Sequence, residues 1–149
     1  MLGTYVRGDV ANAEVSLFIG KNPWQSHSIP HARSTLKEIA RDPQRSMIVI
    51  DPRRSETAEL ADFHLQVRPG RDAWLVAAMA AIVVQEDLID HAFVAEHTLG
   101  AAEVLDTLGA IPVTRYCGIA GSPRTWSAGR CGASPPRRAS RWPRTWACR

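Results

Sequence analysis

The stretch SMIVIDPRR, residues 46–54, decides the fold of this chain. Within it, the four apolar residues 47–50 run straight into Asp51, Pro52 and Arg53. A short apolar run that contains β-branched residues and ends at a turn is typical of a buried central strand in a parallel sheet. Ligands of open α/β sheets bind at the carboxyl ends of such strands. We therefore expect an α/β fold whose parallel sheet has these three residues at its ligand-binding edge.

The three residues that follow this strand carry groups that suit a nucleotide. The carboxylate of Asp51 can accept hydrogen bonds from ribose hydroxyls or a guanine edge, and the guanidinium of Arg53 can pair with phosphate. Pro52 stiffens the turn that presents them. The alternative is that the tripeptide only ends the strand, because turns favour Asp and Pro in any case. The tripeptide by itself leaves both interpretations open.

A second strand and a helix precede this stretch. Val15–Ile19 is an apolar run with strand character, and residues 20–27 after it form a polar loop. A helical pattern of apolar residues begins at Pro30 and stops at Asp42 and Pro43. Strand, loop, helix and strand together make one βαβ unit, and such crossovers are right-handed. We therefore expect the two strands to be parallel.

Further elements are expected after Arg54. In chain order they are a helical turn, a strand, a loop and three helices, over residues 55–59, 63–67, 68–72, 73–84, 88–96 and 101–108. Asp72 is expected to cap the first of these helices. That helix is apolar on every side, so we expect it to be buried. Residues from Pro112 onward are expected to form an exit segment.

Three loops that each follow a strand are expected to meet at one edge of the sheet: residues 20–26, 51–55 and 70–72. Gly20 and Gly70 allow close approach of a ligand to the backbone, and Asn22 and Ser26 offer hydrogen bonds. The helix that begins near Asp72 can add N–H donors for a phosphate. The G-x-G-x-x-G fingerprint and the P-loop motif are both absent from the sequence, so no motif indicates NAD or ATP.

Hydrolytic and metal sites find little support in the sequence. His27 and His31 lie four residues apart, but a proline separates them and no carboxylate or Cys completes a ligand set. Ser26 and His27 have no G-x-S-x-G elbow around them and no acid partner. We therefore assign no metal ligand and no catalytic residue.

Composition narrows the class of protein. The 149 residues suffice for one domain with a proper core. Three Cys without a C-x-x-C pair indicate neither a disulfide framework nor a zinc or iron–sulfur site, and they fit a cytoplasmic protein. The apolar run over residues 73–84 is shorter than the roughly 20 residues of a membrane helix. Met1 is not followed by a signal-peptide pattern, so we expect no membrane partner.

Three segments together resemble the molybdopterin oxidoreductases, specifically the group of formate dehydrogenase and periplasmic nitrate reductase: IGKNPWQSH, VIDPRRSETAELADFHLQVRPGRDAW and QEDLIDHAFVAEHTLG. The similarity runs from about Asp9 to Gly121 and is strongest to formate-dehydrogenase-like members. Such enzymes hold molybdenum or tungsten on two pyranopterin guanine dinucleotides. The resemblance implies that residues 1–121 are part of a Rossmann-like domain that binds one molybdopterin guanine dinucleotide.

The resemblance also implies a set of cofactor-binding residues: Gly20, Lys21, Asn22, Ser26, Asp51, Pro52, Arg53, Gly70, Arg71 and Asp72. Asp51, Pro52 and Arg53 would contact the guanosine end of the cofactor, whereas Gly70 and Asp72 would close the site. Arg71 departs from the family, which has Thr or Ser at this position. Its long cation can pair with a cofactor phosphate or crowd it.

Other parts of such enzymes have no counterpart in this sequence. The family carries a Cys-rich iron–sulfur segment ahead of this domain, and the protein ligand of the metal also lies outside it. The chain is therefore expected to be a fragment that is inactive alone and whose partners are the remaining domains or subunits of the oxidoreductase. The alternative is a free-standing Rossmann-like module that binds an ordinary nucleotide or a protein partner and has no redox activity.

The last 28 residues differ in composition from the rest. Residues 1–121 hold 11 Lys and Arg against all 15 Asp and Glu, whereas residues 122–149 hold seven Arg, no acid and three of the five Trp. An Arg-rich segment with interleaved Trp is one pattern of a nucleic-acid-binding arm. Written in chosen G+C-rich codons and translated one base back, however, this segment becomes VAEDLVGRAVRRIAAAPSVAVAEDLGVQ, which resembles the continuation of the family. We therefore expect residues 122–149 to be a frameshifted, disordered tail that binds no nucleic acid.

Overall fold

The computed structural model describes residues 8–27 and 29–121 of the chain. The expected frameshifted tail over residues 122–149 lies outside them. The described residues fall into two compact units, one up to Leu65 and the other from Gln66 onward. The first unit holds the sheet and two helices, and the second unit is helical.

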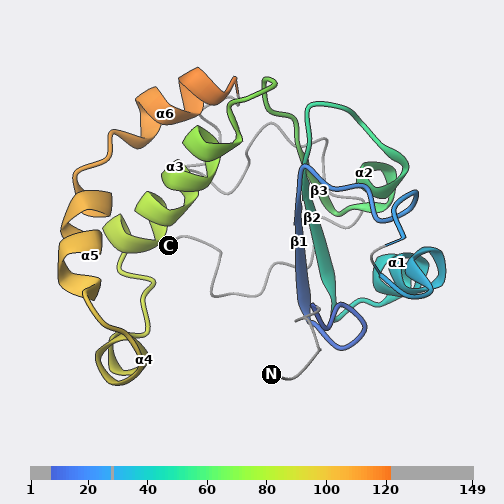
Figure 1. Ribbon diagram of the computed structural model, residues 1–149, viewed down its shortest axis with the longest axis horizontal. Helices are drawn as coiled ribbons and strands as arrows, with labels where there is room; N and C mark the ends of the chain where they lie inside the picture. Colours follow the sequence, from blue (N-terminus) through green and yellow to red (C-terminus); the bar gives the residue numbers. More distant parts are fainter. Residues whose placement is uncertain (1–7, 28, 122–149) are drawn as a thin grey trace, which may run out of the picture. The chain divides into compact units, whose positions relative to one another are not determined.

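The sheet of the first unit has three parallel strands: β1 (Val15–Ile19), β2 (Ser46–Ile50) and β3 (Phe63–Leu65). Their order is β1-β2-β3, so β2 is the central strand (Figure 1). The predicted α/β fold with a parallel sheet is confirmed. In the register of the sheet, Ile50 lies opposite both Ile19 and Leu65, which are the last residues of their strands. The three strands therefore end at the same edge.

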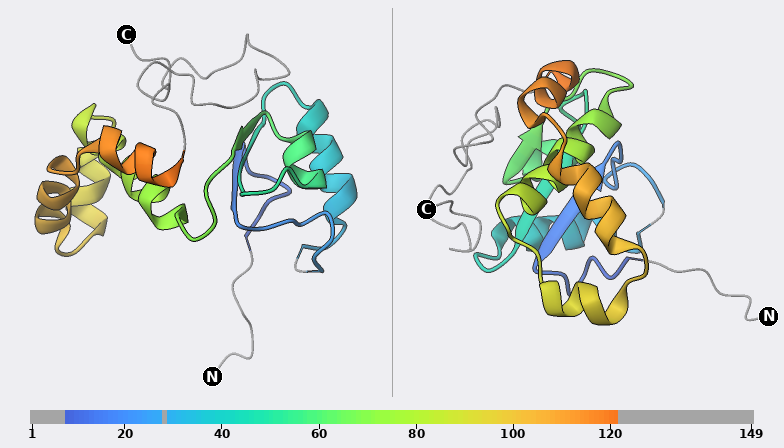
Figure 2. Two further views of the ribbon diagram at one scale, coloured as in Figure 1. Left: turned by 90° about the horizontal axis from the view of Figure 1, so that it is seen from above. Right: turned by 90° about the vertical axis from the view of Figure 1, so that its left-hand side faces the viewer.

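Helices α1 (Ala32–Arg41) and α2 (Glu56–Leu60) cover the same face of this sheet (Figure 2, left). Side chains alternate between the two faces of a strand. Phe18, Met47 and Val49 therefore share the face toward these helices. The buried core of the unit comprises Phe18, Leu36, Ile39, Met47, Val49, Ala58 and Ala61. Its members come from the apolar pattern that predicted β1, β2 and α1.

Polar contacts hold the amino ends of the strands, opposite the edge where the loops emerge. The backbone N–H of Met47 donates to Oδ2 of Asp62 at 2.9 Å, and the N–H of Asp62 donates to the carbonyl of Met47 at 2.9 Å. The guanidinium of Arg45 donates to the carbonyls of Ala13 at 2.9 Å and Val10 at 2.6 Å. These contacts stabilise the sheet without involving its carboxyl edge.

The second unit contains α3 (Asp72–Gln85), α4 (His91–His97), α5 (Ala101–Gly109) and α6 (Val113–Ala120). Trp74 and Tyr116 meet edge to face, with ring centroids 4.7 Å apart, and join α3 to α6. Nε2 of Gln85 lies 3.2 Å from the carbonyl of Gly109 and 2.9 Å from that of Ile111, which ties the end of α3 to the end of α5.

Several sequence-based expectations are wrong in this second unit. Asp72 does not cap α3; it is the first helical residue, after an N-cap at Arg71 that makes no side-chain cap bond. The predicted exit segment is instead helix α6, because packing of Cys117 and Ala120 overrides a weak local helical pattern. Helix α3 is not buried all round: Val76 is 37% exposed, and the buried residues form one stripe, Leu75, Ala78 and Ala81.

The strand expected over residues 63–67 is shorter than predicted, because β3 ends at Leu65. The helices expected over residues 88–96 and 101–108 are present as α4 and α5. No helix within residues 8–27 and 29–121 combines the length and apolarity that crossing a bilayer requires.

Leu36 offers a test of the core of the first unit, because its side chain is 1% exposed between the helix and the sheet. We expect Leu36→Ala to lower the free energy of unfolding by about 2–5 kcal/mol, since it leaves a cavity. Urea unfolding followed by circular dichroism measures this. Leu99→Ala is the control, because Leu99 is 103% exposed and its truncation should cost less than about 0.5 kcal/mol. Equal losses in the two variants would contradict this core.

Candidate functional site

Two of the predicted loops emerge side by side at the carboxyl edge of the sheet. The first loop, residues 20–27, follows β1, and the second, residues 51–55, follows β2. The N–H of Gly20 donates to the carbonyl of Ile50 at 2.8 Å, which joins the starts of the two loops. Gly20 has φ of 58°, and this left-handed conformation favours glycine. The structure thus brings Gly20 and its successor Lys21 beside the turn that begins at Asp51.

A hydrogen-bond network fixes the first loop to α2. We call Asn22, Trp24, Gln25, Glu56 and Thr57 the loop network. The hydroxyl of Thr57 donates to Oδ1 of Asn22 at 2.6 Å and accepts from the N–H of Trp24 at 3.2 Å. Nδ2 of Asn22 donates to Oε2 of Glu56 at 2.9 Å, and Nε2 of Gln25 donates to Oε1 of Glu56 at 2.6 Å. Thr57 has no exposed surface, so its bonds are shielded from water.

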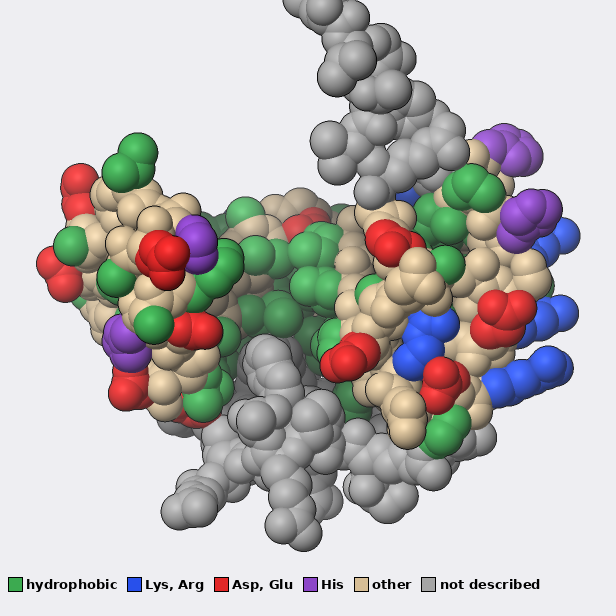
Figure 3. Space-filling view, turned by 90° about the horizontal axis from the view of Figure 1, so that it is seen from below, with side chains coloured by type: hydrophobic (Ala, Val, Ile, Leu, Met, Phe, Trp, Pro, Cys, Tyr) green, Lys and Arg blue, Asp and Glu red, His purple; other side chains and the backbone are tan. Residues whose placement is uncertain are grey.

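The first loop also contacts α1 and closes on itself. The side chains of Arg33 and Lys37 lie over the ring of Trp24, with Cζ and Nζ 5.5 and 5.4 Å from its centroid. Nε of Arg33 donates to the carbonyl of Trp24 at 3.1 Å. The carbonyl of Asn22 accepts from the N–H of Ser26 at 3.0 Å. Figure 3 shows Lys and Arg side chains gathered along one side of the first unit, where α1 exposes such residues.

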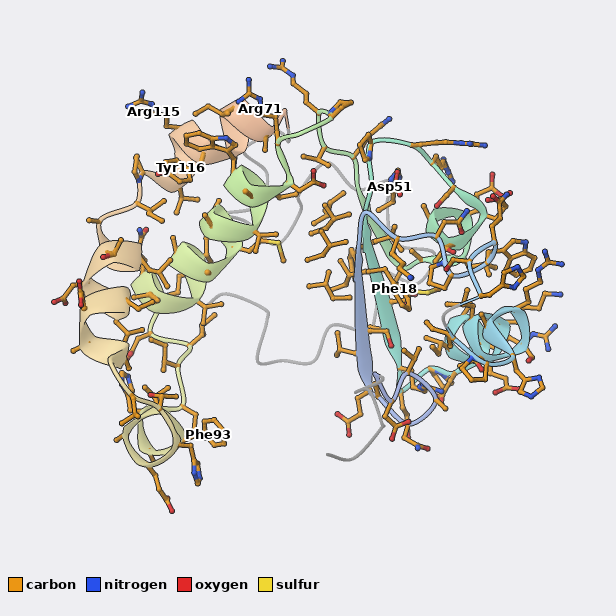
Figure 4. The ribbon with its side chains drawn as sticks, viewed as in Figure 1. Phe18, Asp51, Arg71, Phe93, Arg115 and Tyr116 are labelled. Carbon is orange, nitrogen blue, oxygen red and sulfur yellow. The ribbon has the colours of Figure 1, made fainter. Side chains whose placement is uncertain are left out.

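The turn after β2 uses Asp51 in its own geometry. Oδ1 of Asp51 accepts from the N–H of Arg53 at 2.8 Å, and the carbonyl of Asp51 lies 3.0 Å from Nε2 of His64. Oδ2 of Asp51 has no hydrogen-bond partner among the residues that the structure describes. Figure 4 shows Asp51 at the end of the strands from which the loops emerge. One carboxylate oxygen therefore shapes the turn, and the other remains available to a ligand.

The remaining predicted residues are placed by their own surroundings. Pro52 is half-buried and Arg53 is exposed in the turn after Asp51. Gly70, Arg71 and Asp72 belong to the second unit, where Gly70 has φ of 73° and the N–H of Arg71 donates to the carbonyl of Arg68 at 3.0 Å. Their place beside the first two loops stays a prediction.

Sequence reasoning missed Glu56 and Thr57, which it assigned only to a helical turn. Their partners lie 31 to 35 residues away in the chain, so no local pattern predicts the contacts. A weaker signal was present, since a polar first turn directly after a loop at the carboxyl edge is well placed to contact its neighbour. His27 and His31 are both exposed, and no group of three metal-ligating side chains occurs in the described ranges.

Hydrogen bonds hold the pKa of Glu56 below its ordinary value. The largest effect comes from the backbone N–H of Glu56, and the amide of Asn22 follows; Gln25 and the charge of Arg53 act in the same direction. Burial opposes them but does not prevail. Glu56 is therefore a carboxylate that accepts two side-chain hydrogen bonds, which are stronger than bonds between neutral groups.

The lowered pKa of Glu56 predicts a dependence of stability on acid. A carboxyl whose pKa is lower in the folded than in the unfolded state stabilises the fold fully above its unfolded value, 4.5, and loses this contribution as the pH falls through the folded value. We therefore expect the melting temperature of Glu56→Gln to fall less steeply below pH 4.5 than that of the wild type. Glu59→Gln, an exposed carboxylate of the same helix, is the control. Parallel acid profiles for wild type and Glu56→Gln would contradict the prediction.

Known proteins resemble this chain over most of its length. Residues 3–127 match the family described as Molybdopterin oxidoreductase. The F420-dependent formate dehydrogenase 2 subunit alpha of Methanococcus maripaludis is 33% identical over 115 residues, which cover 77% of this chain and 17% of that protein. A nitrate reductase of Synechocystis sp. is 33% identical over 114 residues, or 74% of this chain and 16% of that protein.

A solved structure agrees with the sequence matches. Acetylene hydratase from Pelobacter acetylenicus superimposes with a TM-score of 0.65 and 31% sequence identity, over 80% of this chain and 16% of that one. The chain thus spans about a sixth of the length of these relatives. The family predicted from the loop segments is confirmed, because its match covers most of the sequence. The chain belongs to the molybdopterin oxidoreductase family and is part of an oxidoreductase domain related to those of formate dehydrogenases.

Proposed function

We propose that this chain binds the guanosine end of one molybdopterin guanine dinucleotide at the carboxyl edge of its sheet. The observation that carries the proposal is the available Oδ2 of Asp51, held at that edge by the bond between Oδ1 and the N–H of Arg53. A carboxylate oxygen in this position can accept from the N–H groups of a guanine edge or from ribose hydroxyls. The family membership supports this cofactor rather than another nucleotide.

The residues of the first unit fit such a group. A Cβ added at Gly20 would meet no atom within 4 Å, so a ligand has room to approach the backbone there. Arg53 is exposed beside Asp51 and can pair with a phosphate of the cofactor. Lys21 and Ser26 lie on the loop next to this turn, and Gly70, Arg71 and Asp72 at the start of α3 would complete the site with N–H donors.

When bound, the complete cofactor supplies the molybdenum or tungsten centre at which such enzymes exchange electrons with a substrate. This chain would bind and orient one guanine dinucleotide of that cofactor. The remaining domains or subunits of a cytoplasmic oxidoreductase would provide the ligand of the metal, the iron–sulfur clusters and the substrate pocket. The proposed activity of the assembled protein is that of a formate-dehydrogenase-like enzyme.

GDP, which carries the guanosine end of the cofactor, provides a test of Asp51 by titration calorimetry. We expect the wild type to bind GDP, and we expect Asp51→Ala to bind it at least tenfold more weakly, because a charged hydrogen-bond acceptor is lost. Asp51→Asn is the matched control for the turn, because its Oδ1 can still accept from the N–H of Arg53. It should also bind GDP weakly, because its amide presents a donor where the guanine edge needs an acceptor.

Two results would contradict this role of Asp51. Wild-type affinity in Asp51→Asn with weak binding in Asp51→Ala would mean that Asp51 only shapes the turn. Equal affinity of the wild type for GDP and ADP would favour the alternative, a module for ordinary nucleotides, because a site built around a guanine edge discriminates against adenine.

A further expectation concerns turnover. The 149-residue chain has three Cys, without the spacing of an iron–sulfur motif, so it has no path for electrons of its own. We expect the purified chain to show no formate oxidation with an artificial electron acceptor. A co-purified formate dehydrogenase is excluded by repeating the assay on Asp51→Ala material prepared in the same way. Formate oxidation that the wild type shows and this variant lacks would contradict the expectation.

A further inference from the structure

We propose that Thr57 and Glu56 are positioning residues that hold the first loop in its cofactor-binding conformation, and that Asn22 is their anchor on the loop and not a ligand of the cofactor. This inference rests on the proposed function. It assigns a role to two residues of α2 that face the loop and changes the predicted role of Asn22 from binding to positioning.

Both ends of the Asn22 side chain are engaged within the protein. Its amide oxygen accepts from the hydroxyl of Thr57 at 2.6 Å, and its amide nitrogen donates to Oε2 of Glu56 at 2.9 Å. Turning this amide toward a ligand would leave the Thr57 hydroxyl, which is fully buried, without its acceptor. Asn22 therefore holds its loop on α2 better than it would hold a cofactor.

Thr57 binds the loop at two points. Its hydroxyl donates to the side chain of Asn22 and accepts from the backbone N–H of Trp24 at 3.2 Å. A single buried hydroxyl thus fixes the backbone on one side of Pro23 and a side chain on the other. The proline between them is also buried, which limits the other conformations open to the loop.

Glu56 connects the first loop to the second. Its two carboxylate oxygens accept from Asn22 and Gln25 of the first loop. The charge of Arg53, in the turn that follows Asp51, also favours its ionised form. A displacement of Glu56 would therefore disturb both segments that are proposed to contact the cofactor.

The network is separate from the contacts that hold the sheet together. Helix α2 has its own N-cap, since Oγ of Ser55 accepts from the N–H of Ala58 at 3.4 Å. Ala58 and Ala61 anchor the helix in the core, and Asp62 joins the end of the helix to the start of β2. Removing the Thr57 hydroxyl should therefore free the first loop while the sheet stays folded.

The test compares variants of the 149-residue chain by two measurements. One is the hydrogen-exchange rate of the Trp24 amide, which reports its bond to Thr57, and the other is the affinity for GDP. We expect Thr57→Val, which keeps the shape of the side chain but lacks the hydroxyl, to raise the exchange rate and to weaken GDP binding, each about tenfold. Thr57→Ser restores the hydroxyl and should behave as the wild type in both measurements.

Asp62→Ala is the matched control for stability. It removes a side-chain bond to the backbone N–H of Met47 at the opposite end of the sheet. We expect it to lower the melting temperature while leaving the Trp24 exchange rate and the GDP affinity unchanged. A merely structural role of Thr57 would make the two variants alike in all three measurements.

A double-mutant cycle decides the role of Asn22. If Asn22 acts through the network, adding Asn22→Ala to Thr57→Val should weaken GDP binding less than twofold further, because one link has already been lost. A further tenfold loss would overturn the anchor role and make Asn22 a ligand. If Thr57→Val does not fold, Asn22→Ala in the wild type breaks the same bond from its half-buried end and must increase Trp24 exchange.

The outcomes separate this inference from the proposed function. Wild-type exchange of Trp24 in Thr57→Val, or in Asn22→Ala, would overturn the positioning role whether or not GDP binds. Absence of GDP binding by the wild type would contradict the proposed function, and the Trp24 exchange rates would then decide by themselves whether Thr57 holds the loop.

Discussion

The parallel pairing of β2 with both of its neighbours is the constraint on which the candidate site depends. Because the register places Ile19, Ile50 and Leu65 side by side, all three strands end at one edge, and the loops after β1 and β2 must start there. The bond from the N–H of Gly20 to the carbonyl of Ile50 extends this pairing into the first loop. A slip of the register by one residue would turn the core side chains to the other face and separate the loops.

Polar contacts then convert this shared edge into a defined shape. At the amino ends of the strands, Asp62 and Arg45 bind backbone groups and stabilise the sheet. At the carboxyl ends, by contrast, the buried hydroxyl of Thr57 and the carboxylate of Glu56 bind the first loop. Hydrogen bonds shielded from water and bonds to a charged group are the stronger ones, so this edge is held more firmly than exposed loops usually are. The division lets the site vary without loss of the core.

Much of the first unit could be predicted because its signals are local. The apolar runs of β1 and β2 and the helical spacing of Leu36 and Ile39 lie within single elements, and each was recognised in place. Helix α6 was missed, since its stability comes from burying Cys117 and Ala120 in contacts that its own sequence does not announce. Glu56 and Thr57 were missed for the same reason, because their partners lie more than 30 residues away.

Arg71 shows how one departure from the family affects more than one property. A Ser or Thr at an N-cap can accept from the first turn of its helix, and its loss typically costs about 1 kcal/mol. Arg71 is the N-cap of α3, makes no side-chain cap bond, and places a cation at the positive end of the helix dipole. Asp72 in the first turn offsets part of this repulsion. A bound phosphate would offset the remainder, so the substitution makes the start of α3 less stable alone and more favourable to an anion.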